Sequence, residues 1–415
     1  MSIYFDRYAY ADQLIASPPS NNLGMIVTIP CYNEPDLIKS LASLAYCHPC
    51  PQDVEVIVVI NHSENADDEV KKRNQETYKS ALEFASIHNS EHLTFHILLQ
   101  ELPTKHAGVG LARKITMDEA ARRLDEVNKP EGVIICFDAD ILCEDNYLLA
   151  IYSHFQSNPK SPGCSIHFEH PLEGELDEAN YQAIIDYELF LRYYVHALRY
   201  AGFPHAYQTI GSSMAVRNYI YQKQGGMNKR KAGEDFYFLH KIIPLGEFGE
   251  ITDTKVIPSA RTSERVPFGT GKAVNDWLNN RKLDTYHIKT FLDLKEFYTK
   301  LNLVEDYNSL NNSLLDDLSS PIVEFANSIK LLENIERIKR NSSNIETFKS
   351  NFHQWFDGFK VLKYVHFARD HFYPNIPVLE ASKLLFEVND WKFEGETAKD
   401  YLLHFRELDR KSDSF

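Results

Sequence analysis

Two aspartates, Asp138 and Asp140, directly follow an apolar run and are the residues most suited to chemistry. The run, residues 133–137, is rich in β-branched side chains and predicts a buried strand. Open α/β sheets bind their ligands just beyond the carboxyl ends of the strands. Carboxylates there offer hard oxygen ligands, which suit Mg²⁺ or Mn²⁺ carrying a phosphate-bearing substrate. The alternative is that both acids are turn residues that solvate the strand end.

The elements that must position these acids are visible as alternating strand and helix patterns. Apolar runs at 25–29, 54–60 and 93–99 predict three earlier strands, and helix-length segments at 36–47, 67–88 and 108–124 follow them. Such alternation predicts a mostly parallel sheet with right-handed crossovers and helices on both faces. No GxGxxG follows the first strand and no GxxxxGK[ST] occurs, which weakens a dehydrogenase or a P-loop NTPase.

The second half of the chain changes character near residue 291. Before it we expect strands at 163–169 and 254–258 and a tyrosine-rich helix at 178–200. Beyond it glycine nearly vanishes and amphipathic helical segments follow one another, at 292–301, 320–340, 344–363 and 378–388. The sequence predicts a helical C-terminal region over 291–415, to which no role can be assigned.

The totals exclude some classes of function. The chain has 415 residues, 43% of them hydrophobic, so a sizeable core is expected. A net charge of −15 argues against a nucleic-acid surface, which needs a basic footprint. No apolar run approaches the roughly 20 residues that span a bilayer, and the first residues lack a signal-peptide pattern. We expect a cytoplasmic protein and leave contact with a membrane surface open.

The six cysteines are scattered, and several lie in apolar strands. We expect them to be reduced and to act as small core residues. Cys47-His48-Pro49-Cys50 forms a CxxC, but a zinc site would need a second ligand pair, and none is apparent in the sequence.

Four motifs occur in a fixed order along the first two thirds of the chain. They are the turn Pro30-Cys31-Tyr32-Asn33-Glu34, the segment from Gly108 to Arg113, Asp138-Ala139-Asp140, and Glu234-Asp235 at a predicted helix start. This order resembles the GT-A glycosyltransferases, particularly glycosyltransferase family 2, over about residues 24–270. Each motif is weak alone, but four in this order at strand and helix ends are specific.

The resemblance implies a GT-A fold and an enzyme that moves a sugar from a nucleotide-diphospho-sugar donor to an acceptor hydroxyl. It implies a glycosyltransferase domain over 1–290, with a nucleotide-sugar half at about 24–145 and an acceptor half at about 146–290. The donor would be a UDP- or GDP-sugar. The acceptor, whether a glycan, a lipid-linked molecule or a small molecule, is not indicated.

The resemblance also implies a role for each motif residue. Pro30, Tyr32 and Glu34 would surround the nucleoside, and Arg113 would lie near the diphosphate. Asp138 and Ala139 would belong to the donor site, with Asp138 contacting the ribose or metal-bound water. Asp140 would ligate the Mn²⁺ or Mg²⁺ ion that stabilises the leaving diphosphate.

At the acceptor side, Asp235 would be the general base of an inverting displacement, and Glu234 would position the acceptor or share that role. A helix N-terminus lowers the pKa of a carboxylate, whereas burial raises it. The simpler interpretation is that both acids only begin a helix.

The sequence departs from the family pattern in three places. After the second strand, where most members have an acidic pair, it has Asn61-His62-Ser63; Asn61 can still hydrogen-bond a base edge. The QxxRW motif of processive synthases is absent. The late segment 261–269 has no histidine that could serve as an extra metal ligand, and Arg261 and Arg265 could close over the diphosphate instead. Three other histidines are candidates, each expected to be structural: His167, His170 and His240.

Three alternatives stay open. One is a retaining enzyme resembling mannosylglycerate or glucosyl-phosphoglycerate synthases, in which Asp235 would not be a base. A sugar-phosphate nucleotidyltransferase is less favoured, because it normally carries a glycine-rich, arginine-containing loop after the first strand. The last is an inactive binding module on the same fold.

Overall fold

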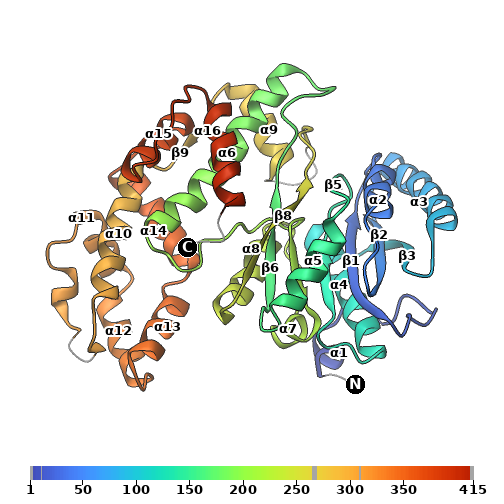
Figure 1. The fold of residues 1–415 in the computed structure, drawn as a ribbon, viewed down its shortest axis with the longest axis horizontal. Coiled ribbons are helices and arrows are strands. Elements are labelled where there is room, and N and C mark those ends of the chain that lie inside the picture. Colours follow the sequence, from blue (N-terminus) through green and yellow to red (C-terminus); the bar gives the residue numbers. More distant parts are fainter. Residues whose placement is uncertain (1–2, 11, 264–268, 308–309, 412–415) are drawn as a thin grey trace. The chain divides into compact units, whose positions relative to one another are not determined.

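The computed structural model describes residues 3–10, 12–263, 269–307 and 310–411. These residues divide into two compact units. The first unit contains residues 1–174, 209–272 and 409–415, and the second contains 175–208 and 273–408. Figure 1 shows that the first unit carries the large sheet, whereas the second is built mostly of helices.

The large sheet has eight strands in the order β3-β2-β1-β4-β7-β6-β8-β5. Neighbours β3-β2, β2-β1, β1-β4 and β6-β8 are parallel, and β7 is antiparallel to both of its neighbours. The strands are β1 (Leu23–Cys31), β2 (Asp53–Ser63), β3 (Leu93–Leu102), β4 (Val133–Cys136), β5 (Leu142–Cys143), β6 (Gly163–Phe168), β7 (Met214–Arg217) and β8 (Gly249–Ile257).

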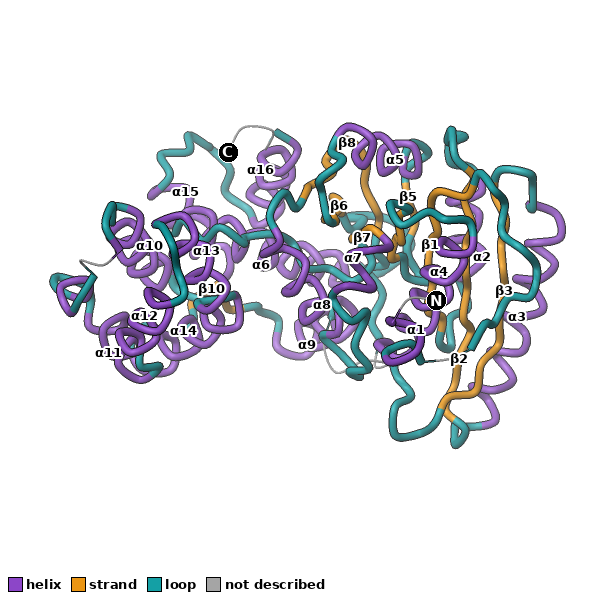
Figure 2. The backbone as a smooth tube through the Cα atoms, turned by 90° about the horizontal axis from the view of Figure 1, so that it is seen from below, coloured by secondary structure: helices purple, strands orange, loops and turns teal. Residues whose placement is uncertain are grey.

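Helices connect and cover these strands. In the sheet unit and its border they are α1 (Ile3–Arg7), α2 (Leu37–Ala45), α3 (Asp68–His88), α4 (Val109–Glu126), α5 (Tyr147–Ser157), α7 (Asn218–Lys223), α8 (Glu234–Ile242), the 3-10 turn Ile243–Leu245, and α9 (Thr270–Asn280). Helix α3 packs on β2 and β3, and α4 packs on β1 and β2. Figure 2 shows α3 beside the long edge strand β3. The α/β class and the mostly parallel sheet flanked by helices are confirmed.

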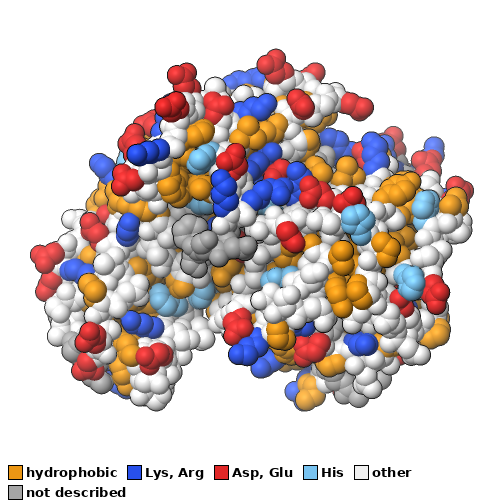
Figure 3. Space-filling model, viewed as in Figure 1, with side chains coloured by type: hydrophobic (Ala, Val, Ile, Leu, Met, Phe, Trp, Pro, Cys, Tyr) orange, Lys and Arg blue, Asp and Glu red, His pale blue; other side chains and the backbone are white. Residues whose placement is uncertain are grey.

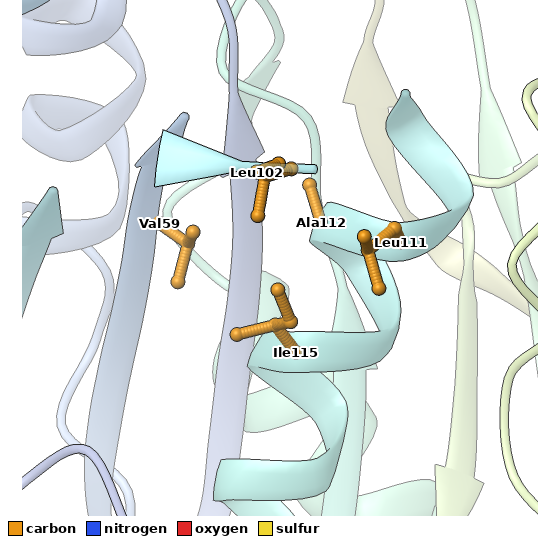
Figure 4. Packing of buried hydrophobic residues seen from close by; sticks show 5 residues of the cluster. All are labelled: Val59, Leu102, Leu111, Ala112 and Ile115. Atoms are coloured by element: carbon orange, nitrogen blue, oxygen red, sulfur yellow. The ribbon is translucent and has the colours of Figure 1, made fainter. Parts of the chain in front are cut away.

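The first turn of α4 is held on the sheet by a small apolar cluster. Its side chains Leu111, Ala112 and Ile115 pack against Val59 of β2 and Leu102 at the end of β3 (Figure 4). Successive residues of a helix are rotated by about 100° around its axis, so residue 113 lies on the opposite side of α4 from this apolar face. The cluster therefore orients Arg113 away from these strands.

The N-terminal segment contacts α4 through side chains and backbone. Tyr4 is 3% exposed and donates a hydrogen bond to Asp118, which also accepts one from Tyr221 at 2.6 Å. Lys114 donates to the Tyr4 hydroxyl at 2.9 Å. Tyr4 therefore joins the N-terminal segment to α4 through a buried polar contact.

The second unit is helical, as expected for the C-terminal region. Its elements are α6 (Glu178–Tyr200), α10 (Ile288–Asn302), the 3-10 turn Asn312–Leu315, α11 (Ser320–Ser328), α12 (Leu331–Arg340), α13 (Ile345–Trp355), α14 (Gly358–His371), α15 (Val378–Val388) and α16 (Ala398–Arg410), which ends at its border, with the short pair β9 (Asp284–Thr285) and β10 (Ile376–Pro377). Residues 320–340 form two helices because Lys330 adopts the left-handed conformation, with φ 54°. Residues 344–363 are likewise divided, where Asp357 caps α14.

The unit boundary differs from the predicted division at residue 290. Helix α6 lies within the predicted acceptor half, yet it packs on α10 and α15 and belongs to the helical unit. Its fully buried Glu188 accepts hydrogen bonds from Arg192 and from Arg406 of α16, at 2.7–2.9 Å. A buried acid needs such partners, so this ion-pair cluster ties α6 to a helix more than 200 residues later.

In the part of the chain that the structure describes, no helix is both long enough and apolar enough to span a membrane. On the face shown in Figure 3, Lys and Arg side chains are interspersed with Asp and Glu side chains.

Candidate active site

The carboxyl ends of β1, β2 and β4 lie at one edge of the sheet. Thr28 of β1 is paired in parallel with Cys136 of β4 and with Ile57 of β2. The turn after β1, Asn61 near the end of β2, and the turn after β4 therefore emerge together. The two aspartates after β4 lie at the sheet edge where the fold class binds ligands.

Arg113 joins three of the sequence motifs through one buried guanidinium. Its Nη2 donates to Asp138 at 2.8 Å, its Nε donates to Glu234 at 3.1 Å, and its Nη1 donates to the Gly211 carbonyl at 2.9 Å. The side chain is 2% exposed. Burial alone would lower the pKa of Arg113, but the charges of Asp138 and Glu234 raise it, so it stays protonated. Arg113 thus positions the two acidic motifs and has little surface left for a phosphate.

Gly211 is required where Arg113 and Asp235 approach each other. A Cβ atom at this position would lie 2.9 Å from a carboxylate oxygen of Asp235 and 3.0 Å from Nη2 of Arg113. Real Cβ atoms essentially never make contacts as short as the first. The sequence shows a glycine-containing turn before β7, but its neighbours in space cannot be read from it.

Asp235 is a partly buried acid at the start of α8. Gly233, in the left-handed conformation with φ 68°, begins the helix and presents Glu234 and Asp235 in its first turn. Burial and the neighbouring charge of Glu234 raise the pKa of Asp235 to about 6, although Arg113 opposes the shift. The opposing effect of the helix N-terminus, considered from the sequence, is therefore outweighed by burial. A carboxylate with a pKa near 6 is suited to accept a proton at neutral pH.

Arg261 lies in a second group of acids at the same edge. Its Nη2 donates to both oxygens of Glu34, at 2.9 and 3.1 Å, and its Nη1 donates to Asp36 at 2.7 Å. Nη2 also lies 3.8 Å from Asp140. Glu34 is 1% exposed, so the guanidinium compensates a buried charge. The sequence did not single out Asp36 for this site.

Residues 30–34 and Asn61 form the wall expected to hold the nucleoside. Pro30 is buried at the end of β1, and Tyr32 is 39% exposed. The Asn61 amide donates to the Cys31 carbonyl at 2.8 Å, which ties the ends of β1 and β2 together. Contact of these residues with a base or ribose stays a prediction.

The backbone of the turn Asp138-Ala139-Asp140 is held in place by a hydrogen bond from α2. The Ser40 hydroxyl of α2 donates to the Ala139 carbonyl at 2.9 Å. Asp138 and Asp140 keep partly exposed side chains, at 33% and 27%. The turn is thus fixed by its backbone while both carboxylates reach the surface.

The described acids of this edge do not form a metal cluster by themselves. Within the described residues, no group of three or more His, Cys, Asp or Glu side chains could hold a metal ion. His167 instead lies 3.0 Å from Glu169, and His170 lies 3.4 Å from Thr270. Mg²⁺ at phosphate-transferring sites is commonly bound by one or two carboxylates together with oxygens of the substrate. Asp140 and Asp138 can supply such carboxylates. Arg265, expected to close over the diphosphate, lies outside the described residues.

Comparison with known proteins gives matches among solved structures only. No family model matches the sequence, and no curated protein does. The similar structures include S. aureus TarS 1–349 in complex with UDP-GlcNAc, with 14% identity, a TM-score of 0.40, and coverage of 77% of this chain and 92% of that chain. A complex with UDP has 14% identity, a TM-score of 0.38 and the same coverage. A longer TarS structure has 15% identity and a TM-score of 0.39, covering 76% of this chain and 55% of that chain.

These are structures of a GT-A-like glycosyltransferase, the class that the four sequence motifs resemble. With identities of 14–15% and TM-scores of 0.38–0.40, these matches carry no argument about the activity of this chain.

Proposed function

We propose that this chain is a glycosyltransferase that moves a sugar from a nucleotide-diphospho-sugar to an acceptor hydroxyl with inversion. The observation that carries the proposal is the Arg113 guanidinium, which connects Asp138 at the nucleotide edge to Glu234 beside Asp235. One buried cation thereby holds a donor-binding motif and a candidate base in fixed relation.

In this proposal Asp235 acts as the general base. It accepts the proton of the acceptor hydroxyl while that oxygen attacks the anomeric carbon. The bond from the anomeric carbon to the diphosphate oxygen breaks, and the nucleoside diphosphate leaves with the electron pair. The raised pKa of Asp235, about 6, leaves the carboxylate ionised and still basic at neutral pH.

The donor would lie across the edge formed by β1, β2 and β4. Pro30, Tyr32 and Asn61 would face the nucleoside, and the diphosphate would lie near Asp140 and Arg261. Because Arg261 is 32% exposed and already meets carboxylates, it can exchange them for phosphate oxygens. The nucleotide and the sugar are not specified by these contacts.

Asp140, with Asp138 nearby, would hold a Mn²⁺ or Mg²⁺ ion that arrives with the donor. When bound, this ion would neutralise charge on the leaving diphosphate as a Lewis acid. Arg261 provides a second positive charge for the same purpose from the protein.

The decisive experiment combines ligand binding with transfer. Thermal unfolding should be measured with UDP-, GDP- and TDP-sugars, with and without Mn²⁺, since a ligand stabilises by RT ln(1 + [L]/Kd). Asp235→Asn should keep the stabilisation by the donor and lose transfer, while Asp140→Ala should lose the Mn²⁺-dependent part of the stabilisation. Asp253→Asn, at an exposed position of β8, is the matched control. The proposal fails if no nucleotide-sugar stabilises the protein or if Asp235→Asn transfers normally.

The stereochemical outcome separates inversion from retention. Product formed with the opposite anomeric configuration to the donor supports Asp235 as base. Retained configuration would remove that role, even if donor binding and transfer are confirmed.

A further inference from the structure

Two cysteine thiols from distant parts of the sheet unit are in contact. The Sγ atoms of Cys47, after α2, and Cys143, in β5, lie 3.8 Å apart, although the residues are 96 positions apart in sequence. Both cysteines are free. The sequence pairs Cys47 with Cys50 in a CxxC, but the Cys50 thiol points to the His48 carbonyl, 4.0 Å away. The structure therefore gives Cys47 a different neighbour from the one its motif suggests.

The surroundings of Cys47 favour its thiolate. Its sulfur lies 3.8 Å from the Cys143 sulfur, where either thiol can be the donor, and it can donate to the Ser43 and Glu144 carbonyls at 3.5 and 3.7 Å. The Cys143 thiol and the backbone at Leu148 and Tyr147 lower the pKa of Cys47, against burial and the charge of Asp145. Burial instead raises the pKa of Cys50 to about 11. Cys47 is thus the better nucleophile of the CxxC pair.

Access separates this pair from the core cysteines. Cys47 and Cys143 are both partly exposed, whereas Cys31, Cys136 and Cys164 are buried. Of the five, Cys47 and Cys143 are therefore the ones a small oxidant meets first, while the core thiols are protected.

We propose that Cys47 and Cys143 are a redox modification site that forms a reversible disulfide under a peroxide oxidant. In the first step the Cys47 thiolate attacks a peroxide oxygen; the O–O bond breaks, hydroxide leaves and takes up a proton to become water, and Cys47 becomes a sulfenic acid. The Cys143 sulfur then attacks the Cys47 sulfur, the S–O bond breaks, and water leaves. Both thiols are oxidised by two electrons in total, and the peroxide is reduced to water.

Closing the bond would move β5. A disulfide has sulfur atoms about 2 Å apart, so the two must approach by somewhat less than 2 Å from their present contact. β5 is a two-residue edge strand whose register with β8 is set by Leu142 and Cys143, so a small shift affects few ladder bonds. Cys143 follows Asp140 by three positions, so the bond would tie α2 to the chain just after the acidic turn.

The test is covalent and does not depend on the proposed activity. The full chain is treated with hydrogen peroxide, quenched with a thiol-alkylating reagent, and digested for peptide mass mapping without reduction. We expect a cross-linked pair of peptides containing Cys47 and Cys143, lighter by two hydrogens and released by dithiothreitol. Cys50→Ser should keep this cross-link and Cys143→Ser should lose it, and circular dichroism should establish that each variant is folded.

A cross-link between Cys47 and Cys50 would overturn the proposal, and so would oxidation of Cys47 to sulfinic acid with Cys143 alkylated. Full alkylation of both thiols after peroxide treatment would overturn it as well. Each of these outcomes can be read from the unsubstituted protein, even if a variant fails to fold.

Discussion

The guanidinium of Arg113 donates from Nε to the buried carboxylate of Glu234 at 3.1 Å, across 121 positions of sequence. Of the two adjacent acids, Glu234 receives this cation and Asp235 lies beside Gly211. The two adjacent acids therefore differ in their surroundings: Glu234 balances a buried charge, and Asp235 is the residue to which we assign the proposed base role.

The pH dependence of transfer should report Asp235. Its pKa is raised to about 6, so the base form is lost as the pH falls through that value. We expect kcat/KM to be level above pH 7 and to fall about tenfold per pH unit well below pH 6. Steady-state kinetics between pH 4.5 and 8 measure this, with donor binding followed in parallel to exclude unfolding. If kcat/KM does not fall as the pH drops through about 6, Asp235 is not the general base.

The raised pKa of Asp235 also predicts that replacing this residue with a neutral one makes the folded protein more stable. For an acid whose folded pKa lies above its unfolded value, stability falls as the pH rises between the two values. Asp235→Asn should therefore be more stable than the original chain at pH 7, by on the order of 1 kcal/mol, and equally stable near pH 3. Urea unfolding at both pH values tests the expectation, and a lower midpoint at pH 7 would contradict it.

Substitution of Arg113 should destabilise the sheet unit and abolish transfer. Arg113→Ala leaves Asp138 and Glu234 without their shared cation, and breaking a buried pair costs about 3–5 kcal/mol. Arg113→Lys keeps the charge but cannot reach three partners in a fork geometry, so it should recover only part of the stability. Arg73→Ala, at an exposed position of α3, is the control and should unfold like the original chain. Equal urea midpoints for all variants would show that Arg113 does not join the motifs in solution.

Gly211→Ala should reduce activity more than it reduces donor binding. The added Cβ would displace Asp235 or Arg113, so we expect kcat to fall about 100-fold, as misplacement of a reacting group by about 1 Å can do. Ser213→Ala is a nearby control, because the buried Ser213 hydroxyl has no hydrogen-bond partner in the structure as described. Kinetics of both variants decide the matter; a normal kcat for Gly211→Ala would mean that Asp235 is not held at this position.

Arg261 and a divalent cation should compete for the same acids. Arg261→Ala removes the internal cation from Glu34, Asp36 and Asp140, so affinity for Mn²⁺ without nucleotide should rise about tenfold, or about 1.4 kcal/mol. Affinity for the nucleotide-sugar should fall, because a phosphate partner is lost. Titration calorimetry with MnCl₂ and with each donor measures both effects. Unchanged Mn²⁺ binding would place the cation elsewhere.

The sequence by itself predicted six of the eight strands of the described sheet, without β5 and β7, and the edge at which the acids lie. Apolar runs fix buried strands locally, and the residues that end them, such as Asp138, need no information from distant segments. Helix α6 was predicted with its observed bounds for the same reason, because its pattern repeats along one continuous segment. The α/β class follows from these local patterns and their order.

Only the tertiary structure decided which of these residues meet. The bonds from Arg113 to Glu234 and to Gly211, and the contact between Cys47 and Cys143, join residues that are 121, 98 and 96 positions apart. The grouping of α6 with the helical unit and the approach of Arg261 to Glu34 are of the same kind. Such pairings depend on how separate elements pack, and no local pattern of residue types encodes a distance between two side chains. The sequence therefore predicts acids at one edge of the sheet, and the tertiary structure shows that Arg113 contacts one group of them and Arg261 contacts the other.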